Sequence, residues 1–154
     1  MSSKWIIYGL LFIGLLILMN FVGPFKGTGN SDFPEEYQPR DSNPLPACPG
    51  SPNCARLSVP MQHQAGPLFE ASLNALRGLG AGELDPDREN LQLDAVFKIP
   101  VFGFRDDFSV RIVDGSADGE TFLHISSRSR TGEGDLGVNR RRINSFLESV
   151  QSNL

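Results

Sequence analysis

The hydrophobic positions in the second half of the chain predict two helices. Over residues 67–79 the apolar side chains recur every three or four residues, with Pro67 suited to the first turn of a helix and Gly80 to its end. Residues 139–151 carry a second apolar stripe of this kind, formed by Ile143, Phe146, Leu147 and Val150. Each stripe needs a partner surface, because an amphipathic helix buries one face.

Three other runs alternate apolar and polar residues, which predicts strands with one buried face. They cover residues 91–98, 108–112 and 120–129, and a short fourth strand at 83–85 is left open. Short loops join consecutive runs, so the strands are expected to pair antiparallel, with both helices on the apolar side. We therefore expect an α+β fold in which a small antiparallel sheet of three to four strands packs against two helices.

Near the start of the chain the pattern becomes an unbroken apolar run. Residues 5–25 carry no charge, and 21 residues of helix at about 1.5 Å each reach about 30 Å, the thickness of a bilayer's hydrocarbon layer. Trp5 and Tyr8 stand near one end, where interfacial aromatic residues belong. This predicts a single transmembrane helix, with residues 1–26 as a signal anchor that contacts the lipid bilayer through residues 5–25. A cleavable secretory signal is the alternative, but the apolar core is long for one and no A-x-A-like site follows.

The charges that flank this run predict its orientation. Lys4 precedes the run, whereas Lys26 is followed by Asp32, Glu35 and Glu36. We expect the N-terminus in the cytoplasm and the C-terminal body outside it, which in a bacterium means a single-pass protein of the inner (cytoplasmic) membrane with a periplasmic domain. Residues 27–47, rich in Gly, Pro, Ser and Asn, read as a flexible linker, and residues 48–154 as the extracytoplasmic domain.

Composition and charge exclude several classes of protein. The chain has 154 residues and a formal net charge of −4, and residues 27–154 carry 12 basic and 18 acidic side chains, hence −6. Such an acidic domain does not suit nucleic acid, whose phosphates require an excess of Lys and Arg. With 40% hydrophobic and 21% charged residues the chain is too apolar to be disordered. One folded domain accounts for its length.

The only two cysteines, Cys48 and Cys54, enclose a short segment with two prolines and a glycine. Outside the cytoplasm such a pair is expected to form a disulfide that closes a seven-residue ring. Unpaired thiols remain an alternative. A redox or zinc site is disfavoured, because a catalytic dithiol has C-x-x-C spacing and zinc needs two further ligands.

The junction between the last strand and the last helix concentrates basic residues. Arg128 and Arg130 are two apart, so they share one face of the strand with His124. Three consecutive arginines, residues 140–142, then begin the helix, where their charge opposes the positive end of the helix dipole. A negative group must compensate them. It could be an anionic ligand at this corner or a carboxylate of the chain, the candidates being Asp106, Asp107 and Asp135.

The glycines of this junction do not predict a cofactor site. Gly132, Gly134 and Gly137 satisfy G-x-G-x-x-G, but a dinucleotide site needs a further parallel strand with an acidic residue, and only helix follows. Glu133 and Asp135 would also repel a pyrophosphate. A tight loop held by Asp135 and Asn139 through nearby backbone and arginines is favoured over a ligand cradle, and no cofactor or metal is expected.

Two adjacent aspartates and a histidine are compatible with an enzyme, but their arrangement in the sequence does not predict one. Adjacent residues of an extended segment point to opposite faces, so Asp106 and Asp107 are poorly placed as an acid and base pair, and one of them is expected to pair with an arginine. His124 fits a hydrogen-bonded sheet residue better than a catalytic base. No nucleophile elbow, H-E-x-x-H or phosphate-loop pattern occurs.

Three segments carry a resemblance to a known family. They are the cysteine segment 48–54, the F-G-F-R-D-D segment 102–107, and the S-R-S-R-T-G segment 127–132 with its continuation to residue 143. In these the chain resembles the bacterial and plastid family called domain of unknown function 1499, from about Pro46 to the carboxyl end. The resemblance implies no reaction, but it implies an exported or lumenal protein. The positions that match the last motif are Arg128, Arg130, Asp135, Asn139, Arg140 and Arg142.

Two functional hypotheses follow. The favoured one is a membrane-tethered binding or envelope-assembly module whose arginine-rich junction meets an anionic lipid, a glycan or an acidic protein surface, since residues 121–154 hold 5 basic and 3 acidic side chains. The alternative is an envelope hydrolase that uses Asp106 or Asp107 with Asp135 and His124. A third reading is that the motifs only build the fold.

Overall fold

One antiparallel sheet forms the body of the protein. The computed structural model describes residues 33–99, 103–115 and 120–154. Its strands are β1 (Cys54–Met61), β2 (Glu83–Asp87), β3 (Gln92–Ile99), β4 (Phe104–Gly115) and β5 (Glu120–Ser129). They lie in the order β1-β5-β4-β3-β2, and every neighbouring pair is antiparallel. The strands β1 and β2, consecutive in the chain, therefore form the two edges of the sheet.

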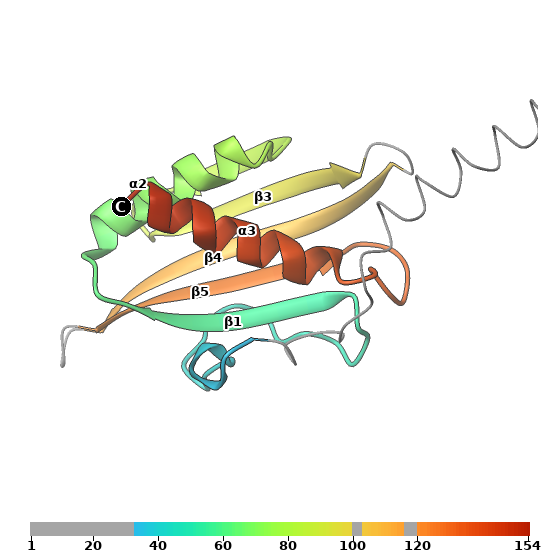
Figure 1. The fold of residues 1–154 in the computed structure, drawn as a ribbon, viewed down its shortest axis with the longest axis horizontal. Helices are drawn as coiled ribbons and strands as arrows, with labels where there is room; N and C mark the ends of the chain where they lie inside the picture. Colours follow the sequence, from blue (N-terminus) through green and yellow to red (C-terminus); the bar gives the residue numbers. More distant parts are fainter. Residues whose placement is uncertain (1–32, 100–102, 116–119) are drawn as a thin grey trace, which may run out of the picture.

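Two helices cover one face of this sheet. They are α2 (Ala65–Gly78), which connects the two edge strands, and α3 (Val138–Ser152), which follows β5 (Figure 1). Pro67 lies in the first turn of α2, where its missing N–H costs no helical hydrogen bond. Gly80 ends the helix in a left-handed conformation, with φ of 78°. The face under the helices is called the helix face below, and the opposite one the outer face.

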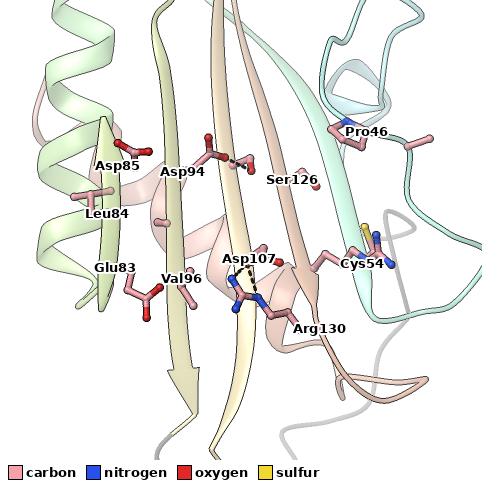
Figure 2. A pocket seen from close by; sticks show the side chains of 14 residues that line it. Pro46, Cys54, Glu83, Leu84, Asp85, Asp94, Val96, Asp107, Ser126 and Arg130 are labelled. Carbon is pink, nitrogen blue, oxygen red and sulfur yellow. Dashed lines mark hydrogen bonds and ion pairs between the residues drawn. The ribbon is translucent and has the colours of Figure 1, made fainter. Parts of the chain in front are cut away.

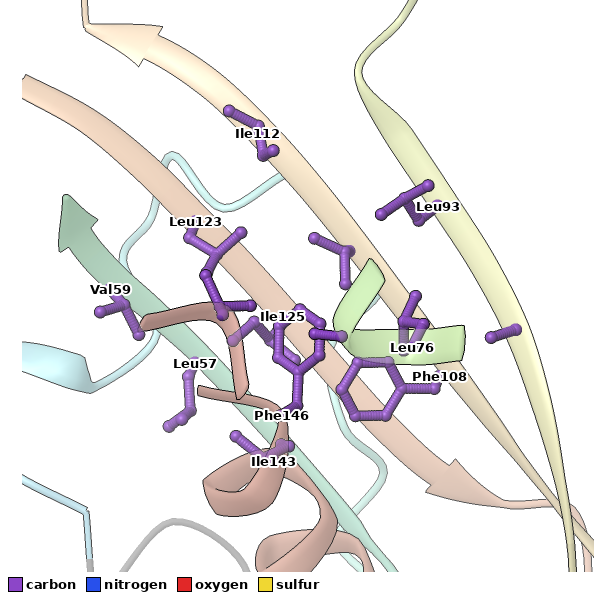
Figure 3. Close-up of a cluster of buried hydrophobic side chains, with 14 of the residues drawn as sticks. Leu57, Val59, Leu76, Leu93, Phe108, Ile112, Leu123, Ile125, Ile143 and Phe146 are labelled. Atoms are coloured by element: carbon purple, nitrogen blue, oxygen red, sulfur yellow. The ribbon is translucent and has the colours of Figure 1, made fainter. Parts of the chain in front are cut away.

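The hydrophobic core lies between the helices and the helix face (Figure 3). Alternate residues of the four longer strands point into it, and the apolar stripes of α2 and α3 close it from above. Phe108 of β4 lies under Phe146 of α3, with ring centroids 5.1 Å apart in an edge-on arrangement. Both rings are fully buried, so α3 is held over the centre of the sheet.

The expected α+β architecture is confirmed, but the expected number of strands is wrong. The sheet has five strands where three to four were expected, and the missed strand is β1. Its alternation of Ala55, Leu57 and Val59 with polar residues is regular, but Pro60 argues against a strand in the interior of a sheet. An edge strand tolerates proline, and the other edge strand, β2, also contains one at Pro86.

Residues 33–47 lie within the stretch for which the sequence predicts a linker, and here they contact the sheet. The 3-10 turn η1 (Glu35–Tyr37) packs beside β1, and Phe33 joins the hydrophobic core. Asn43 donates through Nδ2 to the carbonyl of Leu57 at 2.9 Å. This segment therefore covers the β1 edge of the sheet.

No helix within residues 33–99, 103–115 and 120–154 is long and apolar enough to cross a bilayer. The transmembrane helix expected at residues 5–25 lies outside the described residues.

Candidate functional site

The structure divides the predicted arginine site between the two faces of the sheet. Arg128 of β5 and Arg130, directly after this strand, lie at the outer face, opposite the buried Leu123 and Ile125. Arg142 of α3 lies on the helix face, because α3 packs on the apolar side of the sheet. These arginines therefore cannot converge on one ligand, and each face is described separately.

The outer face is hollowed by a pocket of about 600 Å³, shown in Figure 2. Its floor is made by outward side chains of β2 to β5, and Pro46, Ala47 and Cys54 contribute to its β1 side. We call it the outer-face pocket. The charged side chains that line it are Glu83, Asp85, Asp94, Asp107, Arg128 and Arg130. Acidic groups thus line the pocket at β2, β3 and β4, and basic groups line it at the end of β5 and directly after it.

Most of these charges are already partnered. Arg130 donates through Nε and Nη2 to Oδ1 of Asp107, at 2.8 and 2.6 Å, and this carboxylate raises the pKa of Arg130 above its ordinary value, through the hydrogen bonds first and its charge second. Glu83 lies 3.5 Å from Lys98 and 3.4 Å from Arg105. Of the two partners of Glu83, Lys98 lies on β3, the strand next to β2, and Arg105 lies on β4.

Asp94 is held by neutral donors. Its carboxylate accepts hydrogen bonds from Ser109 Oγ and Gln92 Nε2, both at 2.6 Å. Two charged side chains of the pocket remain, Arg128 and Asp85, and neither makes a hydrogen bond or ion pair within the described part of the chain. They are exposed and lie toward opposite ends of the pocket, on β5 and β2.

On the helix face, the first turns of α3 cover a buried polar network. Arg142 donates through Nη2 to Oδ2 of Asp106 at 2.8 Å, and Asp106 is fully buried. Its Nη1 donates to Asn139 Oδ1 at 3.0 Å and to Ser127 Oγ at 3.3 Å. The guanidinium also lies over the ring of Phe97, 4.7 Å from the centroid. Asp106 is therefore the counter-charge of Arg142.

Asn139 joins this network to the disulfide ring. Its Nδ2 donates to the carbonyl of Asn53 at 2.9 Å and to Ser129 Oγ at 3.0 Å, and its Oδ1 accepts from Ser127 Oγ at 2.6 Å. Asn53 lies inside the ring closed by Cys48 and Cys54, whose predicted disulfide is present. The side chain of Asn53 also donates to the carbonyl of Gly132 at 2.5 Å. The three sequence motifs thus meet at this corner of the fold.

Asp135 holds the loop that leads into α3. Its two carboxylate oxygens accept the amides of Gly137 at 2.9 Å and Asn139 at 2.8 Å. Gly137 has φ of 75°, a left-handed conformation that favours glycine. Arg141 donates to the carbonyl of Leu136 at 2.9 Å, and Arg140 is half-buried. The loop is therefore held by hydrogen bonds within the chain, which is the interpretation of the glycines that the sequence favours.

The residues proposed for a hydrolase do not come together. His124 is buried on the outer face, where Nδ1 lies 3.0 Å from Ser58 Oγ. Burial, and then the charges of Arg56 and Arg40, lower its pKa to about 4, so the ring is neutral at physiological pH. Asp106 lies on the other side of the sheet, and Asp135 is occupied by backbone amides. Asp107 shares the outer face with His124, but it is paired with Arg130 and lies opposite Arg128, four residues along β5 from His124. His124 is thus the hydrogen-bonded sheet residue that the sequence favours.

The sequence pattern does not identify several residues of the outer-face pocket and of the polar network under α3. Ser127 and Ser129 occupy β5 positions where the alternation calls for apolar side chains, and this mismatch was a signal of buried polar contacts. Asn53 carried no such signal, because its partner lies 86 residues away. Within the described ranges, no three His, Cys, Asp or Glu side chains are grouped so that they could hold a metal ion.

Comparison with protein families gives one match. Residues 44–150 match the model of a family described as "Protein of unknown function (DUF1499)". No curated protein matches the chain.

Proposed function

The chain belongs to the DUF1499 family, and from that premise we propose that it is a membrane-tethered, extracytoplasmic binding protein. Its outer-face pocket would take a small ligand and hold an anionic group of that ligand at Arg128. The proposal includes no chemical step, because Asp106 lies on the opposite face of the sheet from His124, Asp135 accepts two loop amides and Asp107 is paired with Arg130. The disulfide supports the compartment, since such bonds persist in oxidising surroundings.

The single observation that carries the proposal is the state of Arg128. Its guanidinium is exposed and unpaired within the described residues, yet it lines a pocket in which the neighbouring Arg130 is neutralised by Asp107. A planar guanidinium binds carboxylate or phosphate through two parallel hydrogen bonds. A pocket of about 600 Å³ also falls in the range of small-molecule sites.

The unpaired Asp85 gives the ligand a second feature. Its strand, β2, is three strand spacings from β5, which places the two backbones about 14 Å apart. An ammonium group near Asp85 and an anionic group near Arg128 would complement both charges. A short peptide has this form, because four extended residues span about 14 Å between opposite termini. A large acidic protein surface fits less well, because the wall at β2 and β3 is itself acidic.

Tetra-alanine, its C-terminal amide and its N-acetyl derivative test the proposal. They are titrated calorimetrically into the full-length chain in an uncharged maltoside detergent. We expect wild type to bind tetra-alanine about tenfold more tightly than its amide, and Arg128→Gln to bind both equally. Asp85→Asn should lose the discrimination against the acetylated peptide. Arg77→Gln on α2 is the matched control, since it removes the same charge from an exposed site on the helix layer.

Equal affinity of Arg128→Gln and wild type for tetra-alanine would contradict the proposal, as would the absence of binding to wild type. A parallel flotation assay with vesicles that contain phosphatidylglycerol tests the lipid alternative. Vesicle binding that depends on Arg128, without peptide binding, would show that the pocket serves a membrane surface instead.

A further inference from the structure

A smaller cavity of about 190 Å³ lies at the other side of the sheet from the outer-face pocket. It is bounded by the end of β3, the start of β4 and the loop that enters α3. We call it the loop cavity. The residues that matter for its chemistry are Ile99, Phe104, Asp106, Thr131, Leu136 and Val138.

Asp106, one of the residues that line this cavity, has one carboxylate oxygen without a hydrogen-bond partner in the described part of the chain. Oδ2 accepts from Arg142 at 2.8 Å, but Oδ1 has no hydrogen-bond donor in the described part of the chain. The residue is fully buried and lines the cavity. A buried acceptor without a donor is rare in folded proteins and destabilises them, so this oxygen is a candidate acceptor for the donor of a ligand.

The remaining walls are mostly apolar. Ile99 and Val138 contribute branched side chains, while Phe104 and Leu136 are 49% and 45% exposed. Leu136 also has φ of 55°, a left-handed conformation that a side chain other than glycine seldom adopts. A large apolar residue is thus held at the cavity in a strained conformation and remains half in water, where a ligand could cover it.

We infer that the loop cavity is a second binding site, which takes a compact apolar group carrying one hydrogen-bond donor. Apolar cavities of about 150 Å³ accept one benzene-sized molecule, so 190 Å³ accommodates a substituted ring of the size of a phenol. The hydroxyl of such a ring donates to Asp106 Oδ1, and the ring contacts Ile99, Val138 and Leu136.

The charged groups around the cavity decide whether a ligand donates or accepts the hydrogen bond there. Asp106 presents an acceptor, and the second carboxylate of the cavity, Asp135, already accepts two loop amides. The guanidinium of Arg142 is occupied by Asp106, Asn139 and Ser127. The cavity therefore selects a donor and rejects an anion, unlike the outer-face pocket at Arg128, and the two sites are independent.

The probes are para-fluorophenol and para-fluoroanisole. They share a fluorinated ring, but in the anisole a methyl group replaces the hydroxyl proton. Their binding to the full-length chain in phosphatidylcholine nanodiscs is followed by fluorine NMR, with empty nanodiscs measured alongside to subtract partition into lipid. We expect wild type to prefer the phenol by about tenfold, because only the phenol can donate to the carboxylate.

Two variants separate the cavity from its carboxylate. In Asp106→Asn the amide oxygen stays toward Arg142 and the NH₂ group replaces Oδ1, so the variant donates where wild type accepts. The preference for the phenol should then fall to near unity. Val138→Phe fills the cavity while leaving Asp106 and Arg142 in place, and it should abolish binding of both probes.

Saturable phenol binding that Val138→Phe removes, with a preference that Asp106→Asn removes, supports the site. The inference is overturned if wild type binds the phenol no better than Val138→Phe does. It is overturned as well if wild type shows no preference between the two probes. Tetra-alanine binding should be unchanged in Val138→Phe, which keeps this result separate from that of the outer-face pocket.

Discussion

Asn139 Nδ2 donates to the carbonyl oxygen of Asn53 at 2.9 Å, joining the first turn of α3 to the disulfide ring 86 residues earlier in the chain. The same carbonyl also accepts the amide of Ser129 at the end of β5. One peptide group of the ring thus holds both the last strand and the last helix. The corner that carries the sequence motifs therefore connects the disulfide ring, the end of β5 and the start of α3, and it is a candidate site as well.

Replacement of Asn139 by alanine should destabilise the protein. The side chain is 1% exposed, and its loss leaves the hydroxyl of Ser127 without its acceptor and that of Ser129 without its donor. Buried polar groups left unpaired cost about 1–3 kcal/mol each, so we expect a loss of about 2–4 kcal/mol in the free energy of unfolding. Urea denaturation followed by circular dichroism measures it.

Asn144→Ala is the matched control, because Asn144 lies on the exposed side of the same helix. It should change the free energy of unfolding by less than about 0.5 kcal/mol. If the two alanine variants were equally stable, the contacts of Asn139 would not be what holds α3 in place.

The ion pair between Arg142 and Asp106 should behave as a buried pair. Arg142→Met leaves the carboxylate of Asp106 in the interior without its counter-charge, which costs about 3–5 kcal/mol. The double variant Asp106→Leu, Arg142→Met removes both charges and should recover much of this loss. A thermal denaturation series of the two single variants and the double variant gives the coupling. Additive losses would mean that the two side chains do not interact.

The exposed pair on the outer face provides the contrast. Arg130 and Asp107 lie 2.6 Å apart, but their side chains are 42% and 49% exposed. Water screens such pairs, so Arg130→Met should leave the melting temperature unchanged within error. A loss as large as that of Arg142→Met would contradict the assignment of the two arginines to faces of different burial.

The parts of the fold that were predicted well are those with a strong local period. The apolar stripe of α3 and the alternation of β5 can be recognised within one segment, because each element buries a single face. The strand β1 is different, since Cys54 pairs with Arg128 far along the chain. No local pattern shows that pairing, and Pro60 is compatible with β1 because this strand lies at the edge of the sheet.

Two of the sequence predictions, taken together, imply that the arginines are divided between the two faces of the sheet. Arg128 and Arg130 point away from Leu123 and Ile125, and the last helix packs on the apolar side. Arg142 must then lie across the sheet from them. The outer-face pocket itself was not predictable, because its acidic wall comes from strands whose register with β5 depends on the whole sheet.

Removal of the disulfide should cost about 2 kcal/mol. A seven-residue ring restricts the unfolded chain by that amount in the loop-entropy model. The variant Cys48→Ser, Cys54→Ser is compared with wild type in urea, each with and without a reductant. Reductant should lower the midpoint of wild type to that of the variant and leave the variant unchanged. A wild-type midpoint that does not respond to reduction would mean that the bond adds no stability.

His124 should make the stability depend on pH between about 4 and 6.5. Its pKa is about 4 in the folded protein, because burial and the nearby Arg56 and Arg40 disfavour the charged ring, whereas the unfolded chain has the ordinary value near 6.5. As the pH falls through this window, the unfolded state takes up the proton first. The free energy of unfolding should therefore decrease as the pH is lowered, by up to about 3 kcal/mol at pH 4. Above pH 6.5 His124 is neutral in both states, and its titration no longer changes the stability.

The comparison of wild type with His124→Gln isolates this effect from the carboxylates, which titrate in both proteins. The free energy of unfolding is measured in urea at several pH values from 4 to 7.5, and the variant should show the shallower dependence. His63→Gln serves as the control, because His63 is exposed in a loop and lies outside the sheet. If His124→Gln and wild type lost stability in parallel, the ring would be accessible to protons in the folded state. The segment at residues 33–47 would then not seal it as the hydrogen bonds of Asn43 with Leu57 and Ser58 indicate.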